Sequence, residues 1–285
     1  MSLTLREGRP SDAEACGCIC YAAFHAIATE HNFPPDFPTV ELAMGVLSML
    51  LAHPQMYTVV AERDGVIVGS NVVDERSQIA GIGPITVAPD TQNGGVGRAL
   101  MQHVLERTAA RGFPGVRLVQ AAYHARSLSL YTKLDFDPRE PLACLQGPAL
   151  GMRMPGYGVR RASAADVAAC NDLCRRVHGH TRDGELRDAV AQGAATVVEH
   201  GTRITGYATG IAFFAHAVGE TNNDVQALIA AAPDFGGPGF LVPMRNADLF
   251  RWCLHQGLRT VQLMTLMSVG LYNEPRGAYL PSIAY

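Results

Sequence analysis

Three glycines fall within four positions in the stretch "VAPDTQNGGVGRALMQHV" (residues 87–104), where a β-rich segment gives way to an apolar-periodic helix. Because glycine has no Cβ atom, the main-chain N–H groups of such a turn can converge on an anion. The helix that follows adds its free amides and the positive end of its dipole. This combination predicts a binding site for a diphosphate group.

The spacing narrows the choice of diphosphate. The loop lacks the Lys-Ser/Thr of a nucleoside-triphosphate loop, and Leu100 stands where a dinucleotide-binding oxidoreductase has its third glycine. What remains is Gln92-x-x-Gly95-x-Gly97. Similar patterns begin at 78, 153 and 203, but only 92–97 follows a predicted strand and opens a predicted helix. An ordinary glycine-rich turn is the alternative.

This loop resembles that of the GNAT acyltransferase superfamily, in which Arg/Gln-x-x-Gly-x-Gly/Ala binds the pyrophosphate of coenzyme A. A second stretch, "YHARSLSLYTKLDF" (123–136), is similar to the family's later Asn-x-x-Ala/Ser-x-x-Leu-Tyr motif, with Ser127 and Tyr131 in register. Two residues depart from the family pattern, since His124 replaces Asn and Asp135 replaces Gly. The order and spacing of the two motifs together are specific.

The resemblance implies transfer of an acetyl group from acetyl-CoA to an amine, by direct attack in a ternary complex and without a metal. In the family a phenol at the position of Tyr131 protonates the departing thiolate, whereas by spacing alone Tyr131 could simply pack its helix. Main-chain groups of the preceding strand bind the pantetheine arm, and an amide there polarises the thioester carbonyl. The implied cofactor-binding residues are Ile85, Thr86, Val87, Gln92, Asn93, Gly94, Gly95, Val96, Gly97, Arg98, His124, Ser127 and Tyr131.

The general base is less well marked. Many family members carry a Glu on the strand before the loop, but "IAGIGPITV" (79–87) has none. Glu75, with Asp74 beside it, is the nearest carboxylate in sequence and is the candidate base. A water relay is at least as good an explanation, because carboxylates at strand ends are usually only solvated.

The acceptor is expected to bind near "FHAIATEHNFPPDFPT" (24–39), a stiff, Pro-rich loop in the region that usually covers the acceptor site of the family. The predicted substrate-binding residues are Phe24, His31, Phe33 and Phe37. Equally, these aromatic residues could fill the domain's own core. The acceptor itself, a small-molecule or peptide amine, is not identified by the sequence.

The chain also repeats itself. Residues 5–24 align without a gap with 159–178, pairing Arg6 with Arg160 and Asp12 with Asp166, and 59–70 resembles 197–207. A Pro- and Gly-rich connector covers 138–158. The sequence therefore predicts an α/β (α+β) fold of two tandem GNAT-like domains, 1–145 and 157–285, each with a mixed, mostly antiparallel sheet flanked by helices.

Periodicity and turn residues place the elements of the first half. Helices are predicted at 11–28, 39–53, 95–111 and 124–134. Strands are predicted at 3–7, 57–62, 66–74, 79–87, 116–121 and 142–146.

The second half looks like a degenerate copy, similar to the non-catalytic carboxy-terminal domain of tandem bacterial GNAT proteins. Asn246 stands where His124 stands, but Cys253 replaces the tyrosine and residues 212–243 contain no glycine loop. Pyrophosphate binding should therefore be lost. A His216–Cys253 nucleophile pair has no third group to orient it, so core packing is the better interpretation.

Bulk composition excludes other classes. The 285 residues carry a net charge of −3, 48% hydrophobic and 17% charged residues, which argues against a nucleic-acid partner and against disorder. No apolar run reaches the roughly 18 residues of a membrane span, and no signal peptide is visible, so a cytoplasmic monomer or homodimer is expected.

On a helix Cys18 would point away from Cys16 and Cys20, which disfavours a metal site. A non-catalytic acyl-CoA-binding regulator remains the alternative function.

Overall fold

The computed structural model describes residues 3–284. The first half of the chain contains four α-helices and six strands, in an order that agrees with the prediction. Its elements are β1 (Leu3–Glu7), α1 (Ala13–Glu30), α2 (Val40–Ala52), β2 (Met56–Arg63), β3 (Val66–Asp74), β4 (Ala80–Val87), α3 (Val96–Ala110), β5 (Gly115–Ala121), α4 (Ala125–Thr132) and β6 (Asp137–Gln146).

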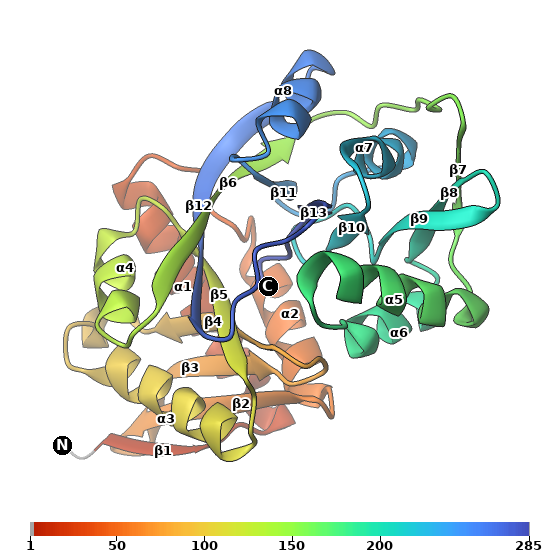
Figure 1. Ribbon diagram of the computed structural model, residues 1–285. Coiled ribbons are helices and arrows are strands. Elements are labelled where there is room, and N and C mark those ends of the chain that lie inside the picture. The colour runs from red at the N-terminus through yellow and green to blue at the C-terminus, as the bar shows by residue number, and fades with distance from the viewer. Residues whose placement is uncertain (1–2, 285) are drawn as a thin grey trace.

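The second half repeats this order, with a shorter first helix, and adds a final strand, β13 (Figure 1). They are β7 (Tyr157–Arg161), α5 (Val167–His178), α6 (Asp183–Ala191), β8 (Thr196–His200), β9 (Arg203–Ala208), β10 (Ala217–Gly219), α7 (Asn222–Ala231), β11 (Phe240–Pro243), α8 (Ala247–His255), β12 (Arg259–Gly270) and β13 (Ala278–Leu280).

The aligned residues of the two halves form the same ion-pair clamp. Arg6 on β1 binds Asp12 at 2.7 Å, at the start of α1, and also binds Glu62 on β2 at 2.7 Å. In the second half Arg160 binds Asp166 and Glu199 at 2.8 Å each. Each clamp ties the first strand to the helix that follows it and to the neighbouring strand. The gapless match between 5–24 and 159–178 thus reflects a shared structural need.

The two halves exchange strands within one large sheet. Its order is β1-β2-β3-β4-β5-β12-β6-β11, while a second sheet has the order β13-β10-β9-β8-β7. Strand β12 runs between β5 and β6 and is antiparallel to both. The pairing of β4 with β5 is parallel and the other strand pairs are antiparallel. The predicted α/β fold with mixed, mostly antiparallel sheets is confirmed, and the domain limits 1–145 and 157–285 stay a prediction.

Helices cover both faces of the first-half sheet (Figure 1). On one face, Leu100 and Val104 of α3 and Tyr131 of α4 pack on β2–β5. On the other, Cys16 and Cys20 of α1 and Leu47 of α2 pack on β2 and β3. Leu47 and Leu100 are fully buried, so truncation of either to alanine should cost about 2–5 kcal/mol.

The cysteines of the CxCxC run behave as the helical spacing predicts. Cys16 and Cys20 are buried side by side in the core, and Cys18 is exposed. Burial raises the pKa of the Cys16 thiol to about 11. Residues 3–284 contain no cluster of three or more His, Cys, Asp or Glu side chains that could hold a metal ion. Nor does any helix in that range have the length and apolarity required to cross a membrane.

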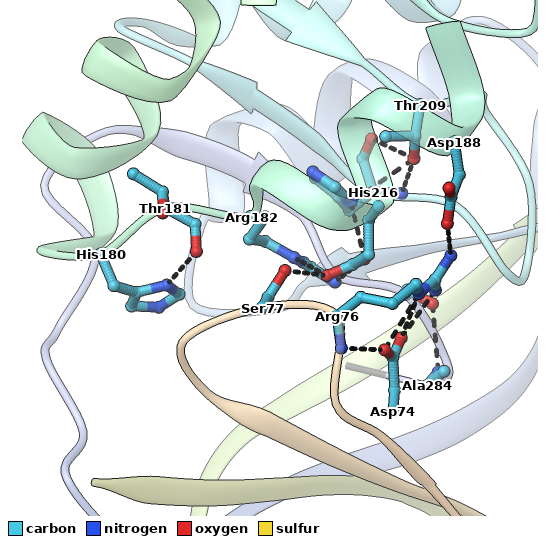
Figure 2. Close-up of polar contacts among 12 residues, drawn as sticks. Asp74, Arg76, Ser77, His180, Thr181, Arg182, Asp188, Thr209, His216 and Ala284 are labelled. Carbon is cyan, nitrogen blue, oxygen red and sulfur yellow. Dashed lines mark hydrogen bonds and ion pairs between the residues drawn. The ribbon is translucent and has the colours of Figure 1, made fainter. Parts of the chain in front are cut away.

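The loop after β3 joins the two halves. Arg76 binds Asp74 at 2.6 Å and reaches across to Asp188 of α6 at 2.9 Å, as Figure 2 shows. The Ser77 hydroxyl donates a hydrogen bond to the Glu185 carboxylate, and the Thr181 main-chain N–H donates one to the side-chain oxygen of Gln78. These bonds fix the end of β3 and the start of β4 against the second half.

Candidate active site

Strands β4 and β5 diverge and open a gap in the sheet. They pair only at Ala80–Val116 and Gly81–Arg117. Beyond Gly81, β4 keeps its bonds to β3, and β5 keeps its bonds to β12. The facing edges of β4 and β5 therefore leave main-chain groups without a neighbouring strand. A cavity of about 420 Å³ lies in this gap.

The glycine loop forms one end of the cavity. Gly95 has a left-handed conformation with φ 82°, and α3 begins at the next residue. Gly97 lies in the first turn, where an added Cβ atom would approach Leu130 to 3.6 Å. No acidic residue occupies that turn, so no carboxylate of the turn competes with an anion for the free amides of the helix end. The loop has the shape and polarity that a diphosphate requires.

Side chains around the loop add positive charge. Gln92 donates an amide hydrogen to the Val87 carbonyl at 3.1 Å, which fixes the turn after β4. Arg126 of α4 donates to Gln92 at 2.6 Å and to Asn93 at 3.4 Å. Arg98 lines the cavity, and a Cβ atom added to Gly94 would lie 3.3 Å from the guanidinium of Arg63. Three arginines thus surround the loop, and they suit an anionic ligand.

Tyr131 of α4 lies deep in the same cavity. Its side chain is 5% exposed, and burial raises the pKa of the phenol to about 12, while a hydrogen bond with Ser127 lowers it by less. The phenol is therefore protonated at neutral pH and can act as a proton donor.

The two departures from the family motif are structurally equivalent to the usual residues. His124 is the N-cap of α4, and its Nδ1 accepts a hydrogen bond from the Ser127 amide at 3.1 Å, as an Asn oxygen would. Burial lowers the pKa of His124, which keeps Nδ1 unprotonated. Asp135 has φ 66°, the left-handed conformation that glycine usually adopts, and Gly257 has it in the second half. Asp tolerates this conformation better than most residues.

The candidate base Glu75 is held elsewhere. Its carboxylate is 6% exposed and binds Arg107 at 2.7 Å and Arg111 at 3.3 Å. Asp74 is held by Arg76. Neither residue is among those that line the cavity within residues 3–284. These contacts favour a structural role for both carboxylates.

The predicted acceptor residues divide into two pairs. Phe24 and Phe37 line the cavity and meet edge to face at 5.7 Å. His31 and Phe33 instead pack on Tyr123, with Phe33 stacked at 4.4 Å. Tyr123 itself lines the cavity, so this second pair supports the wall from behind.

Most of the predicted cofactor-binding residues lie together. Gly94 is at the exposed tip of the loop beside Arg63. The other predicted residues all line the cavity, and they are Ile85, Thr86, Val87, Gln92, Asn93, Gly95, Val96, Gly97, Arg98, His124, Ser127 and Tyr131.

Several lining residues were not predicted. Arg126, Gln120 and Asp36 contribute polar groups, and Phe213, Phe214 and Met264 come from the second half. A charged residue between Pro35 and Phe37 in an otherwise apolar loop was a usable signal for Asp36. The second-half residues gave no local signal, because they reach the cavity only through contacts between segments far apart in the sequence.

The corresponding parts of the second half lack the tyrosine and the glycine loop. Asn246 caps α8 as His124 caps α4, but Cys253 is fully buried in an apolar core. At the start of α7, Asp224 accepts the Thr221 amide at 2.8 Å, so the helix end carries its own carboxylate. Such a carboxylate repels phosphate. His216 binds Glu185 and Tyr207, and these contacts are separate from those of Cys253.

Comparison with known proteins agrees with this geometry. Residues 21–136 match the model of the Acetyltransferase (GNAT) family. This segment of the chain is therefore similar to the GNAT family, and the matched residues include both the glycine loop and Tyr131.

Three relatives extend the comparison. Over 93 residues the chain is 29% identical to an IAA acetyltransferase of Azospirillum brasilense. The matched segment makes up 32% of this chain and 61% of that protein. A Pyrococcus horikoshii protein classed as an acetyltransferase has 17% identity and a TM-score of 0.74 over 97% of this chain and 94% of its own. A tandem GNAT protein from the clavulanic acid biosynthesis pathway has 13% identity and a TM-score of 0.56, and the match covers 94% of this chain and 98% of that protein. The two structures show that most of the described chain has the fold of a tandem GNAT protein.

Proposed function

We propose that this protein transfers an acetyl group from acetyl-CoA to an amine, with one working site in the first half. The observation that carries the proposal is that the gap between β4 and β5, the glycine loop and Tyr131 share one cavity. The loop and its arginines suit the pyrophosphate of CoA. The unpaired edges of the diverging strands suit the amide groups of a pantetheine arm.

The chain's own groups would then act in sequence. Main-chain N–H groups of Ile85–Val87 would bind and polarise the thioester carbonyl, a contribution on the order of 3 kcal/mol. Tyr131 would give its proton to the departing sulfur. Direct attack by the acceptor needs no covalent enzyme intermediate, and Cys253 and His216 have no place in it.

In this proposal the second half binds no cofactor and instead completes the acceptor side of the cavity. Phe213, Phe214 and Met264 line the same cavity as residues of α1 and its following loop. The acceptor would enter between the halves.

The test is a thiol-release assay with acetyl-CoA and a panel of small amines and peptides. Turnover with at least one amine, and with none of the matching alcohols, is expected. Acetyl-CoA binding without turnover on any acceptor would favour the non-catalytic acyl-CoA-binding regulator instead.

A further inference from the structure

Two carboxylates line the cavity, and they are Glu30, exposed at the end of α1, and the more buried Asp36. Asp36 lies in the loop between α1 and α2 and lines the cavity with Phe37 and Tyr123. Its Oδ1 accepts a hydrogen bond of 3.0 Å from Nε2 of Gln262 on β12. No Arg, Lys or His within residues 3–284 forms an ion pair with it. When Asp36 is ionised, no cation of the described chain therefore balances its charge.

Such a charge favours a cationic ligand. Burial raises the pKa of the Asp36 carboxyl, and the single hydrogen bond from Gln262 opposes this effect. A desolvated carboxylate without a counter-ion destabilises a protein, and a cation that enters the cavity removes that cost. Gln262 is 3% exposed, so the hydrogen bond holds the carboxylate in a defined position.

Several other residues that line the same cavity are apolar. Phe24 and Phe37 come from the first half, and Phe213, Phe214 and Met264 come from the second. Phe214 is 47% exposed and marks the side of the cavity that is open to solvent. A ligand that satisfies both the walls and the carboxylate has an apolar, preferably aromatic, body and a cationic end.

We propose that Asp36 is the acceptor-binding carboxylate, and that it pairs with the ammonium group of an apolar primary amine and then takes one proton from it. This inference rests on the proposed function. In the proton transfer the N–H bond breaks as the Asp36 O–H bond forms, so the nitrogen keeps its electron pair for attack. The carboxylic acid later releases the proton to solvent. Gln262 is then a positioning residue that the second half supplies.

Direct titration of the full chain tests this inference. The probe is 2-phenylethylamine, measured by calorimetry with and without CoA, against wild type, Asp36→Asn and the control Asp248→Asn, whose side chain is 84% exposed on α8. We expect the Asp36→Asn variant to bind the amine at least tenfold more weakly and Asp248→Asn to match wild type. The neutral analogue 2-phenylethanol should bind wild type and Asp36→Asn alike.

Two further measurements keep the result interpretable. The acetyl-CoA affinity of Asp36→Asn should equal that of wild type. Its thermal midpoint should be no lower than that of wild type, since Asn can keep the bond to Gln262 and removes the desolvated carboxylate. Equal amine affinity in wild type and Asp36→Asn, or no amine binding to wild type, would overturn the inference. Absence of heat with acetyl-CoA would contradict the proposed function and leave the amine titration valid.

Discussion

At the scale of single residues, the chemistry depends most on Tyr131. Its phenol is buried in the cavity, and its raised pKa of about 12 keeps it protonated well above neutral pH. We therefore predict that Tyr131→Phe lowers kcat about 100-fold or more and leaves the acetyl-CoA affinity unchanged. Thiol release and calorimetry measure the two quantities. The control is Tyr157→Phe, on β7 away from the cavity, and unchanged turnover in Tyr131→Phe would show that the phenol only packs α4.

The residues differ in how well the sequence predicted them. Tyr131 and the glycine loop belong to two short motifs, and the resemblance of both motifs to the GNAT family placed them in one site. Asp36 meets Gln262 across 226 positions, and no local pattern encodes that contact. Glu75 was the nearest carboxylate in sequence, but Arg107 and Arg111 hold it away from the cavity.

At the scale of elements, α4 shows how a helix cap keeps its role when the residue type changes. The cap requires an acceptor at the Ser127 amide, and the unprotonated Nδ1 of His124 supplies it. We predict that His124→Ala destabilises the protein by about 1 kcal/mol, whereas His124→Asn retains most of the stability. Urea unfolding at pH 7 measures both. Equal losses in the two variants would contradict the capping role.

The same cap has a defined pH dependence. Burial lowers the pKa of His124 in the folded state, so the unfolded chain binds the proton more readily. The contribution of the cap is complete above the unfolded pKa of about 6.5 and is lost as the pH falls through the folded value. Between pH 7 and pH 5, wild type should therefore lose more stability than His124→Asn.

Element existence and order followed from periodicity, but two features did not. Strand β6 begins at Asp137, whereas the sequence predicted a start at 142. Pro138 and Pro141 argued against a strand in the sequence, yet both lie in β6, where they pair with β12. The placement of β12 between β5 and β6 depends on pairing between distant segments. A repeat in sequence predicts two similar units and does not show which strands they exchange.

At the scale of the whole molecule, the exchanged strands make the halves depend on each other. Without β11 and β12, strand β6 would lose both of its neighbours and β5 would gain an open edge next to the cavity. We predict that residues 1–150 expressed alone lack fixed tertiary structure and do not bind acetyl-CoA. Near-UV circular dichroism and size-exclusion chromatography check this against the full chain. A monomeric fragment with full acetyl-CoA affinity would contradict the prediction.

The central claim is that the bare amides of the glycine loop bind the pyrophosphate of CoA. Calorimetric titration of acetyl-CoA into wild type, Gly97→Leu and Gly45→Leu tests it most directly. Both changes place the same side chain on a helical glycine, but Gly45 on α2 has open space around it, whereas Gly97 lines the cavity. We predict that Gly97→Leu loses at least tenfold in affinity and that Gly45→Leu matches wild type. Equal acetyl-CoA affinity in all three proteins, or no heat with wild type, would contradict the claim.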